Sequence, residues 1–370
     1  MTEGASAAGA GVAATPRAVN RRIAGLDVAR ALAIIGMVAM HVGPASGTGF
    51  WGTAYALPSG RASILFVVLA GLGMGLIDRL KPEARVQHAV RWIWFAAVLL
   101  PLGLALQDLD HGVWIVLHHY AALFLIGLLA LRLPSTWLLP TAVLAGIVGA
   151  ATLLVLRINL PDLPVRDGVS ISDPLGTIVL GLTVSGPYPL ITWICPFLAG
   201  MWLGRLDLRD DDIRSRMVLV GAGVAIAAFV ASQCLVLLLG PVEGPRDWTF
   251  ILTDEPHSQM PLWLLGSTAS AIMLIGLSLI AADRFGRALW PLVAMGQLAL
   301  TVYVGHVVAL DLLRGPSITS DVGEGALILL GITVAAALFA MAWLAIFPRG
   351  PLELLLHAPL RLFRRRPAAA

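Results

Sequence analysis

The sequence contains few charged residues. Only 13% of its 370 residues are Asp, Glu, Lys or Arg, whereas an ordinary soluble domain contains about 25%. Hydrophobic residues make up 58% of the chain, and the mean hydropathy is +0.86. A water-soluble globule cannot bury that much apolar surface, and no polar block is long enough to form a soluble domain. The composition therefore predicts an all-α, polytopic membrane helix bundle.

Cysteines, common catalytic motifs and internal repeats are also scarce or missing. Cys195 and Cys234 both lie in apolar runs, so we expect no structural disulfide between them. The sequence has no P-loop, no dinucleotide-binding glycine pattern after a strand, no nucleophile elbow and no zinc-protease His-Glu-x-x-His motif. We find no internal repeat, so the inverted-repeat pattern of many transporters is missing.

The chain divides into three parts by composition. Residues 1–24 are small and polar and lack the apolar segment of a cleaved signal, so we expect a disordered cytoplasmic tail. Residues 25–348 form the predicted transmembrane domain. Residues 349–370 include "PLELLLHAPLRLFRRR", which is amphipathic and ends in basic residues. We expect this second tail to lie on the inner leaflet.

Apolar segments and their flanking charges predict how the chain crosses the membrane. Ten segments read as spans, each about 20 residues long: 28–46, 62–78, 90–107, 113–132, 137–156, 187–205, 217–240, 261–282, 291–313 and 325–347. With the N-terminus inside, 20 of the 25 Lys and Arg residues lie on the inner side, and the exceptions are Arg61, Arg157, Arg166, Arg246 and Arg314. Because Lys and Arg concentrate on the cytoplasmic side, we expect a multi-pass plasma-membrane protein with both termini cytoplasmic.

Pairs of glycines with Gly-x-x-x-Gly spacing occur in two of these spans. They are Gly71 with Gly75 and Gly200 with Gly204. This spacing is typical of helices that approach each other closely in a membrane. We therefore interpret the pairs as packing grooves.

The first span, in "GLDVARALAIIGMVAMHVGP", carries three ionisable side chains on one helical face. His41 lies eleven residues after Arg30, which is about 20° from it around the helix and roughly 16 Å along it. Asp27 lies three residues before Arg30, within about 60° of the same line. The simplest interpretation of Asp27 and Arg30 is an ion pair at the inner interface. The alternative is that they contribute to a cofactor-binding site at the inner mouth, where Arg30 would meet phosphates.

His41 has two interpretations. A histidine in a span is costly and usually faces the protein interior, so His41 could be a hydrogen-bonded core residue. Neutral imidazole is also the group best placed to take or give a proton near neutral pH. The second interpretation makes His41 the candidate catalytic residue.

Further polar and aromatic side chains are predicted near the outer surface. Arg61 is a lone cation at the outer edge of the second span, and we interpret it as a candidate anion-binding residue. The other candidate substrate-binding residues are Tyr120, Tyr188, Trp193 and His306. For Tyr188 and Trp193 the alternative is an anchor in the aromatic belt at the membrane surface. Other histidines fall on this side too, but none has metal-ligand spacing, and we expect no metal: His111, His118, His119 and His257.

Several stretches, in order and spacing, resemble a known family. They are "GLDVARALAIIGM", "GRASILFVVLAG", "HYAALFLIGLLALRL", "GPYPLITWICPFLAGMWLGRLDL" and "GQLALTVYVGH". Together they resemble the heparan-alpha-glucosaminide N-acetyltransferase-like family in its bacterial, YeiB-like form, over residues 25 to about 310. The resemblance implies transfer of an acyl group, typically acetyl, from cytoplasmic acyl-CoA to an extracytoplasmic sugar, glycan or lipid-linked sugar. A histidine would act as base or as acyl carrier.

One departure from the family pattern affects where the chemistry is placed. In the glucosaminide acetyltransferase, the residue eleven positions after the Arg looks like Asn, and the histidine implied in catalysis lies in the following loop. Here that position is His41, and the loop after it has no histidine. The first span of related acyltransferase-3 proteins does carry a histidine at this spacing. The resemblance therefore implies that His41 is the catalytic residue.

Two other classes of function are consistent with the same residues. A transporter or lipid flippase could use the polar face of the first span as a path, and a non-catalytic membrane partner protein would leave His41 and Arg61 unexplained. The sequence does not specify the acceptor, the length of the acyl chain or whether the chain forms a homodimer. We expect no nucleic-acid partner.

Overall fold

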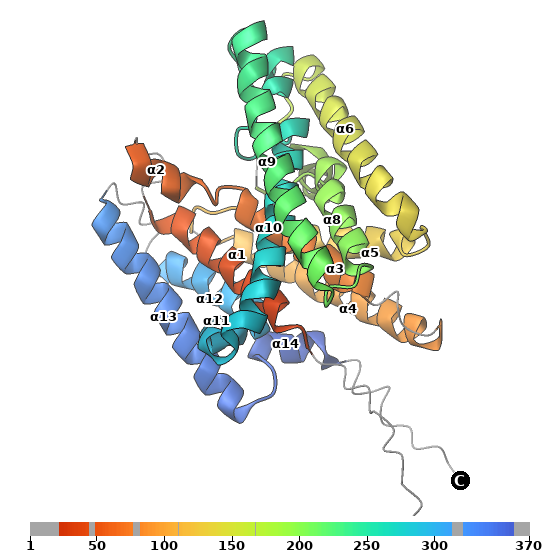
Figure 1. Ribbon diagram of the computed structural model, residues 1–370. Helices are drawn as coiled ribbons and strands as arrows, with labels where there is room; N and C mark the ends of the chain where they lie inside the picture. Colours follow the sequence, from red (N-terminus) through yellow and green to blue (C-terminus); the bar gives the residue numbers. More distant parts are fainter. Residues whose placement is uncertain are drawn as a thin grey trace, which may run out of the picture.

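All regular structure in the described part of the chain is helical. The computed structural model describes residues 22–43, 49–76, 82–109, 111–166, 168–312 and 321–358, with the side chains of 82–88 left aside. These ranges contain helices and no strand, which confirms the predicted all-α fold (Figure 1). Residues 1–21 of the predicted N-terminal tail and 359–370 of the C-terminal tail lie outside the described residues.

Fourteen α-helices follow one another along these ranges. Their bounds are α1 Ala24–Val42, α2 Gly49–Ala56, α3 Arg61–Gly75, α4 Pro82–Gln107, α5 Leu117–Ala130, α6 Ser135–Asn159, α7 Leu175–Leu180, α8 Leu190–Gly204, α9 Asp211–Leu239, α10 Pro261–Phe285, α11 Trp290–Gln297, α12 Ala299–Leu312, α13 Val322–Ile346 and α14 Pro351–Leu356. Glycine, a usual helix stop, directly follows α1, α7, α9 and α10.

The described helices supply seven membrane-spanning candidates, or eight if a bent pair counts as one span. The bent pair is Leu175–Ser185 with Leu190–Gly204, which meet at 59°. The predicted fourth span corresponds to Leu117–Ala130, and the predicted ninth span, 291–313, is divided between Trp290–Gln297 and Ala299–Leu312. Leu117–Ala130 and Ala299–Leu312 are apolar but only 14 residues long. At 1.5 Å per residue each covers about 21 Å of a hydrocarbon core of about 30 Å. The predicted count of ten is therefore not confirmed, and the orientation stays a prediction.

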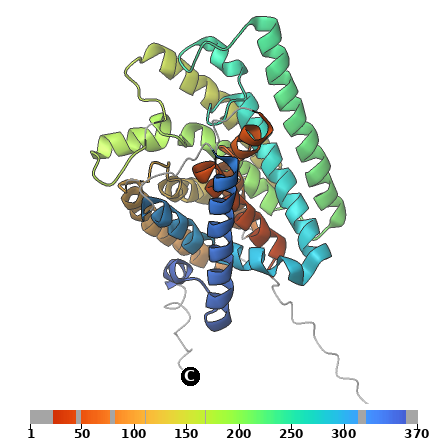
Figure 2. The same cartoon turned by 90° about the vertical axis from the view of Figure 1, so that its left-hand side faces the viewer.

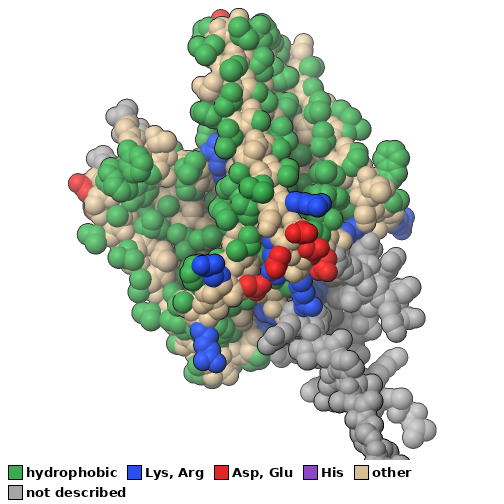
Figure 3. Space-filling view, in the orientation of Figure 1, with side chains coloured by type: hydrophobic (Ala, Val, Ile, Leu, Met, Phe, Trp, Pro, Cys, Tyr) green, Lys and Arg blue, Asp and Glu red, His purple; other side chains and the backbone are tan. Residues whose placement is uncertain are grey.

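Helix α1 lies in the middle of the bundle. It packs against α3, α10, α11, α12 and α13, and most of its side chains are buried. By contrast α9 and α13 lie at the periphery and expose Leu, Val and Phe along their length (Figures 1 and 2). Figure 3 shows this broad apolar surface, with charged side chains gathered toward one end. An apolar exterior of this extent suits hydrocarbon rather than water.

The predicted glycine grooves lie where α3 crosses α8. A Cβ at Gly71 would lie 2.0 Å from the Phe197 carbonyl oxygen, and one at Gly200 would lie 2.1 Å from the Val68 carbonyl oxygen. Gly75 and Gly204 meet the facing backbone in the same way. Only glycine permits backbones this close, so the packing interpretation is confirmed.

The bundle has two different ends, which we name by what they carry. The loop end consists of residues 160–189 and 240–260, between α6 and α8 and between α9 and α10. The α14 end carries α14 and the first turn of α1 (Figure 1). There the Glu353 carboxylate accepts hydrogen bonds from the Leu300 and Thr301 amides at 2.8 and 3.1 Å. A carboxylate at the first turn of α12 is favourable, because those amides lack helical partners.

Candidate active site

Two histidines from distant parts of the chain face each other inside the bundle. His41 lies in the last turn of α1, and His306 lies in the middle of α12. Their rings are parallel to within 6°, with centroids 5.9 Å apart. Sequence analysis selected both residues for separate roles, and the structure brings them together.

The nitrogens of this pair are short of hydrogen-bond partners. His306 is 4% exposed, and neither of its ring nitrogens makes a hydrogen bond of good geometry among the described residues, although the Val302 and Tyr303 carbonyls lie close by. The Nδ1 atom of His41 is buried and unpartnered as well. The core interpretation of His41 predicted a hydrogen-bonded ring, and its Nδ1 does not meet that expectation. Buried polar groups without partners are uncommon and often mark functional positions.

Other polar groups lie around the pair. The rings of Tyr303 and His306 meet edge to face at 5.0 Å. The Tyr303 hydroxyl oxygen accepts a hydrogen bond from the Val116 amide at 3.3 Å, so α12 is tied to the segment before α5. His111 and His257 lie close enough to His41 to interact with it electrostatically. The described residues contain no group of three or more metal-ligating side chains close enough to share an ion.

A cluster of buried aromatic rings carries the predicted residues Tyr188 and Trp193. Their rings are 4.8 Å apart, and the His257 ring lies 5.6 Å from that of Tyr188. Tyr188 is 5% exposed and Trp193 is fully buried. Residues of an aromatic belt would face the lipid surface, so that alternative is wrong for both. These rings pack beneath the loop end instead.

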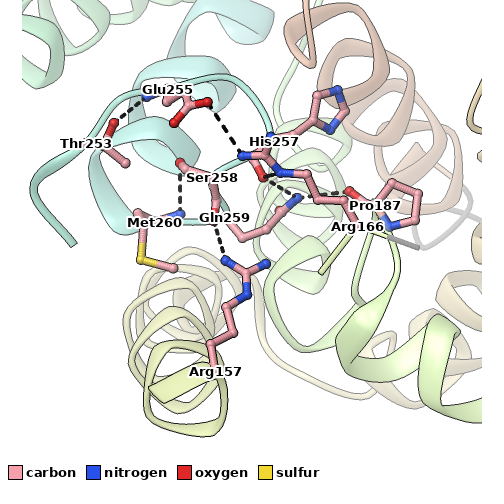
Figure 4. A network of polar contacts seen from close by, with 9 residues as sticks. All are labelled: Arg157, Arg166, Pro187, Thr253, Glu255, His257, Ser258, Gln259 and Met260. Carbon is pink, nitrogen blue, oxygen red and sulfur yellow. Dashed lines mark hydrogen bonds and ion pairs between the residues drawn. The ribbon is translucent and has the colours of Figure 1, made fainter. Parts of the chain in front are cut away.

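Gln259 connects this aromatic cluster to the loop that carries His257. Its Oε1 accepts a hydrogen bond from the Trp193 indole at 2.7 Å, and its Nε2 donates to the Pro187 carbonyl at 2.9 Å. The backbone of both His257 and Gln259 has positive φ, 58° and 70°. Such values are uncommon outside glycine, so surrounding contacts must hold the loop in this shape (Figure 4).

Arginines supply those contacts. They are three of the five arginines that the sequence places on the outer side. Arg157, at the end of α6, donates to the Ser258 carbonyl at 3.2 Å, and Arg166 donates to the His257 carbonyl at 3.0 Å (Figure 4). Arg246 donates to the Leu163 carbonyl at 2.9 Å, which joins the two long loops. Burial lowers the pKa of His257 to about 4, and the Arg166 charge adds to that shift.

Arg61 and Tyr120 are less constrained than these residues. Arg61 begins α3, and its guanidinium donates to the Leu57 carbonyl one turn away at 3.2 Å, with Asp254 in electrostatic range. Tyr120 is 5% exposed, and its hydroxyl is buried without a hydrogen-bond partner. Both therefore keep hydrogen-bonding capacity that a ligand could use.

Asp27 and Arg30 form an ion cluster at the α14 end of α1. Asp27 is 1% exposed and pairs with Arg22, whose Nε lies 2.6 Å from its carboxylate, and with Arg30. The predicted ion pair is therefore confirmed. A pocket of about 440 Å³ adjoins this cluster, and its lining includes Arg22, Asp27 and Arg287.

Three residues of this site were not selected from the sequence. His111 and His257 were noted only as outer histidines, and Gln259 was not noted at all. The signal for the last two is local: "EPHSQMP" places His257 and Gln259 between two prolines in the second long loop. A polar run fixed by prolines before an apolar helix is typical of a structured loop.

The family of the chain follows from a comparison with known protein families. Residues 23–347 match the acyltransferase-3 family model, which describes an acyltransferase domain. The match covers most of the chain, so the chain belongs to the acyltransferase-3 family of membrane acyltransferases. No curated protein is significantly similar to it in sequence.

Proposed function

We propose that this acyltransferase-3 protein moves an acyl group, typically acetyl, from cytoplasmic acyl-CoA to an acceptor in the cell envelope. The acceptor would be a hydroxyl or amine of an extracytoplasmic sugar or glycan, as the narrower likeness to the heparan-alpha-glucosaminide acetyltransferases implies. The loop end would face outward and the α14 end the cytoplasm. The distribution of Lys and Arg along the chain supports this orientation.

The observation that carries the proposal is the pair of apposed imidazoles with unpartnered nitrogens. His41 Nδ1 and both nitrogens of His306 make no hydrogen bond of good geometry among the described residues. In one route His41 accepts a proton from the acceptor's hydroxyl or amine, while the oxygen or nitrogen of that same acceptor group attacks the thioester carbonyl. The C–S bond then breaks, and the proton leaves with the CoA thiol. In the other route a His41 nitrogen attacks the thioester carbonyl, the C–S bond breaks, and CoA leaves as the thiol with the imidazole's proton. The acceptor's oxygen or nitrogen then attacks the acyl-imidazole, the acyl–nitrogen bond breaks, and the acceptor's proton returns to His41.

The pocket at the α14 end supports a cytoplasmic donor. CoA carries phosphates, and arginine binds phosphate oxygens through paired N–H groups. Arg22 and Arg287 line the pocket of about 440 Å³. Arg30 already pairs with Asp27. We therefore propose that Asp27 and Arg30 shape the wall of the donor site, and that Arg22 and Arg287 meet the phosphates.

The loop end supports an acceptor with several hydrogen-bonding groups. Arg61 and Tyr120 keep unused capacity, as described above. Tyr188 donates its hydroxyl to the Trp114 carbonyl at 3.0 Å, and Trp193 is held by Gln259. Arg61 and Tyr120 would contact the acceptor directly, while Tyr188 and Trp193 would shape the wall around it.

A transporter or flippase is the alternative function. The bend of 59° before α8 is a feature that transporters share, since broken helices often line substrate paths. Membership of the acyltransferase-3 family favours the enzyme. Substrate uptake that survives His41→Ala in proteoliposomes would favour the transporter.

The test uses purified protein, radiolabelled acetyl-CoA and a panel of amino sugars and glycosides. We expect the wild type to transfer label and His41→Ala to lose about 10²–10⁴-fold of the rate, the usual share of a general base. His357→Ala, at α14, is the matched control and should keep the rate. Thermal melting of each variant shows that the fold is intact. A folded His41→Ala variant with wild-type turnover would refute the role of His41, and no turnover by the wild type would refute acetyl-CoA as donor.

A further inference from the structure

An apolar pocket opens beside the histidine pair, between α1, α12 and α13. Its volume is about 380 Å³, within the usual range for small-ligand sites. His306 lies on its wall, with Thr301 and Thr333 as the other titratable or hydroxyl-bearing side chains. Aliphatic and aromatic carbon forms the rest of the lining. The chemistry of this pocket fits a hydrocarbon and not a sugar or a nucleotide.

The pocket is open toward the side of the bundle. Helix α13 forms its outer wall and is otherwise exposed, and Phe339 on the pocket is 42% exposed. On α12, Gly305 is exposed and a Cβ built there would meet no atom within 4 Å. In a bilayer this side faces lipid. A chain could therefore enter sideways between α12 and α13 without crossing water.

The depth of the pocket relates it to the histidine pair. Its lining on α12 runs from Thr301 to Ala309, about 12 Å at 1.5 Å per residue, with His306 in between. On α1 its lining residues lie between Ile34 and Val38, so they are closer to the α14 end than His41 is. One leaflet of hydrocarbon is about 15 Å deep. The polar groups His111 and His257 lie near His41, on its loop-end side.

We propose that the acceptor is a lipid-anchored molecule whose hydrocarbon tail occupies this pocket. Its polar head would lie at the loop end, beside His41, and its tail would descend past His306 toward Thr301 and the α14 end. An outer-leaflet lipid has this polarity, with the head above and the chain below. The transfer step rests on the proposed function, whereas binding of the tail does not.

The transfer test compares two acceptors that share one sugar and differ in their aglycone. One is a long-chain alkyl glycoside and the other is the methyl glycoside, both supplied to protein in lipid nanodiscs with labelled acetyl-CoA. We expect kcat/KM to be about tenfold or more higher for the long-chain acceptor, because the tail positions the head at the histidines. Gly305→Leu, which fills the pocket, should remove that advantage and leave the methyl glycoside within about twofold.

The binding test uses a glycoside with a photoreactive diazirine on its alkyl tail. We expect crosslinks to α12 and α13 in the wild type, and at least about a fivefold loss in Gly305→Leu, because leucine occupies the pocket. Gly223→Leu is the matched control for both tests. Gly223 is an exposed helical glycine on α9 with open space around its Cβ, so this variant should behave as the wild type.

The outcomes separate this inference from the proposed function. Equal crosslinking in wild type and Gly305→Leu, or equal kcat/KM for both acceptors, overturns the lipid-anchored acceptor. Octanoyl-CoA serves as a second donor in the transfer test. If Gly305→Leu lowers transfer from octanoyl-CoA but not from acetyl-CoA, and does so with both acceptors, the pocket holds the donor's acyl chain and the lipid-anchored acceptor is overturned. Crosslinking as expected without any acyl transfer supports the tail site and refutes the proposed function.

Discussion

The two ends of helix α1 differ in how their polar groups are satisfied. At the α14 end, Asp27 is buried and holds two arginines, so the charges are paired. At the other end, His41 faces His306 across 5.9 Å with buried nitrogens that have no partner. Both ends carry ionisable groups on the same face of one helix. Only the first follows the rule that buried polar groups are hydrogen-bonded.

This difference suggests a division of labour along α1. A buried carboxylate between two cations fixes the start of the helix, and removing it leaves uncompensated charge. An imidazole with an unused nitrogen stabilises nothing through that atom, but it can exchange protons. Natural proteins usually break local rules at functional sites. The comparison therefore supports a stabilising role for the α14 end of α1 and the proposed proton transfer at the other end.

The largest expected effect on stability comes from breaking the satisfied end. Asp27→Asn removes the charge that holds Arg22 and Arg30, and we expect a loss of about 3 kcal/mol of stability, because breaking a buried pair strands its partners. Turnover per folded molecule should stay within a few-fold. Thermal melting and acetyl transfer on the same samples measure both quantities.

Asp211→Asn is the matched control at the same end. Asp211 pairs with Arg214 but is 91% exposed, and exposed pairs contribute about 0–1 kcal/mol. If Asp27→Asn melts as the wild type does but raises the KM for acyl-CoA by about tenfold, Asp27 and Arg30 serve only as the wall of the proposed donor site and do not stabilise the start of α1.

The next effect compares a histidine that lacks partners with one that has them. His111 accepts from the Val113 amide at its Nδ1, at 3.1 Å, so its Nε2 carries the proton and donates to the Leu106 carbonyl at 2.7 Å. His111→Leu should therefore lose about 1–3 kcal/mol of stability, because it strands the amide and the carbonyl. His306→Leu strands nothing, so its melting temperature should be unchanged or higher. Its turnover should nevertheless fall by about 10²-fold.

Melting temperatures and acetyl-transfer rates of these two variants show whether His306 acts in the reaction or in packing. A strongly destabilised His306→Leu would mean that the ring of His306 serves packing. Turnover equal to that of the wild type would remove His306 from the reaction. His306→Asn, which keeps a polar side chain of smaller size, separates loss of the imidazole from loss of polarity.

The sequence predicted the parts of this molecule that depend on residues near each other in the chain. Spacing of three residues paired Asp27 with Arg30, and spacing of four identified Gly71 and Gly75 as a packing groove, which the structure places against α8. Composition alone predicted the helical membrane bundle. In each case one helix with a known period carries the whole argument.

Contacts between distant segments could not be predicted in the same way. His41 and His306 are 265 residues apart, and no period relates them. For Trp193 the sequence left two interpretations, a substrate-binding residue and an anchor in the aromatic belt, because the position of a residue along a helix does not show whether it faces lipid or protein. The loop that carries His257 and Gln259 depends on Arg157 at the end of α6 and on Arg166 in the first long loop. Such folds follow from tertiary packing and not from local propensity.

The effect that is smallest near neutral pH is a pH dependence of stability that arises at His257. Burial lowers its pKa to about 4, below the unfolded value of about 6.5. Between these values the unfolded chain binds a proton that the folded chain does not, so stability is full above about pH 6.5 and falls as pH drops toward 4. At pH near 5 the loss from this one group is about 2 kcal/mol.

His257→Asn does not titrate, and Asn tolerates the positive φ of this position. Melting temperatures between about pH 7.5 and 4.5 should therefore fall less steeply in the variant. The variant keeps the share due to His357, whose pKa burial also lowers to about 4. Equal slopes in the two proteins would show that His257 gains its proton as readily in the folded protein as in the unfolded chain, so that the contacts around its loop accommodate the charged ring.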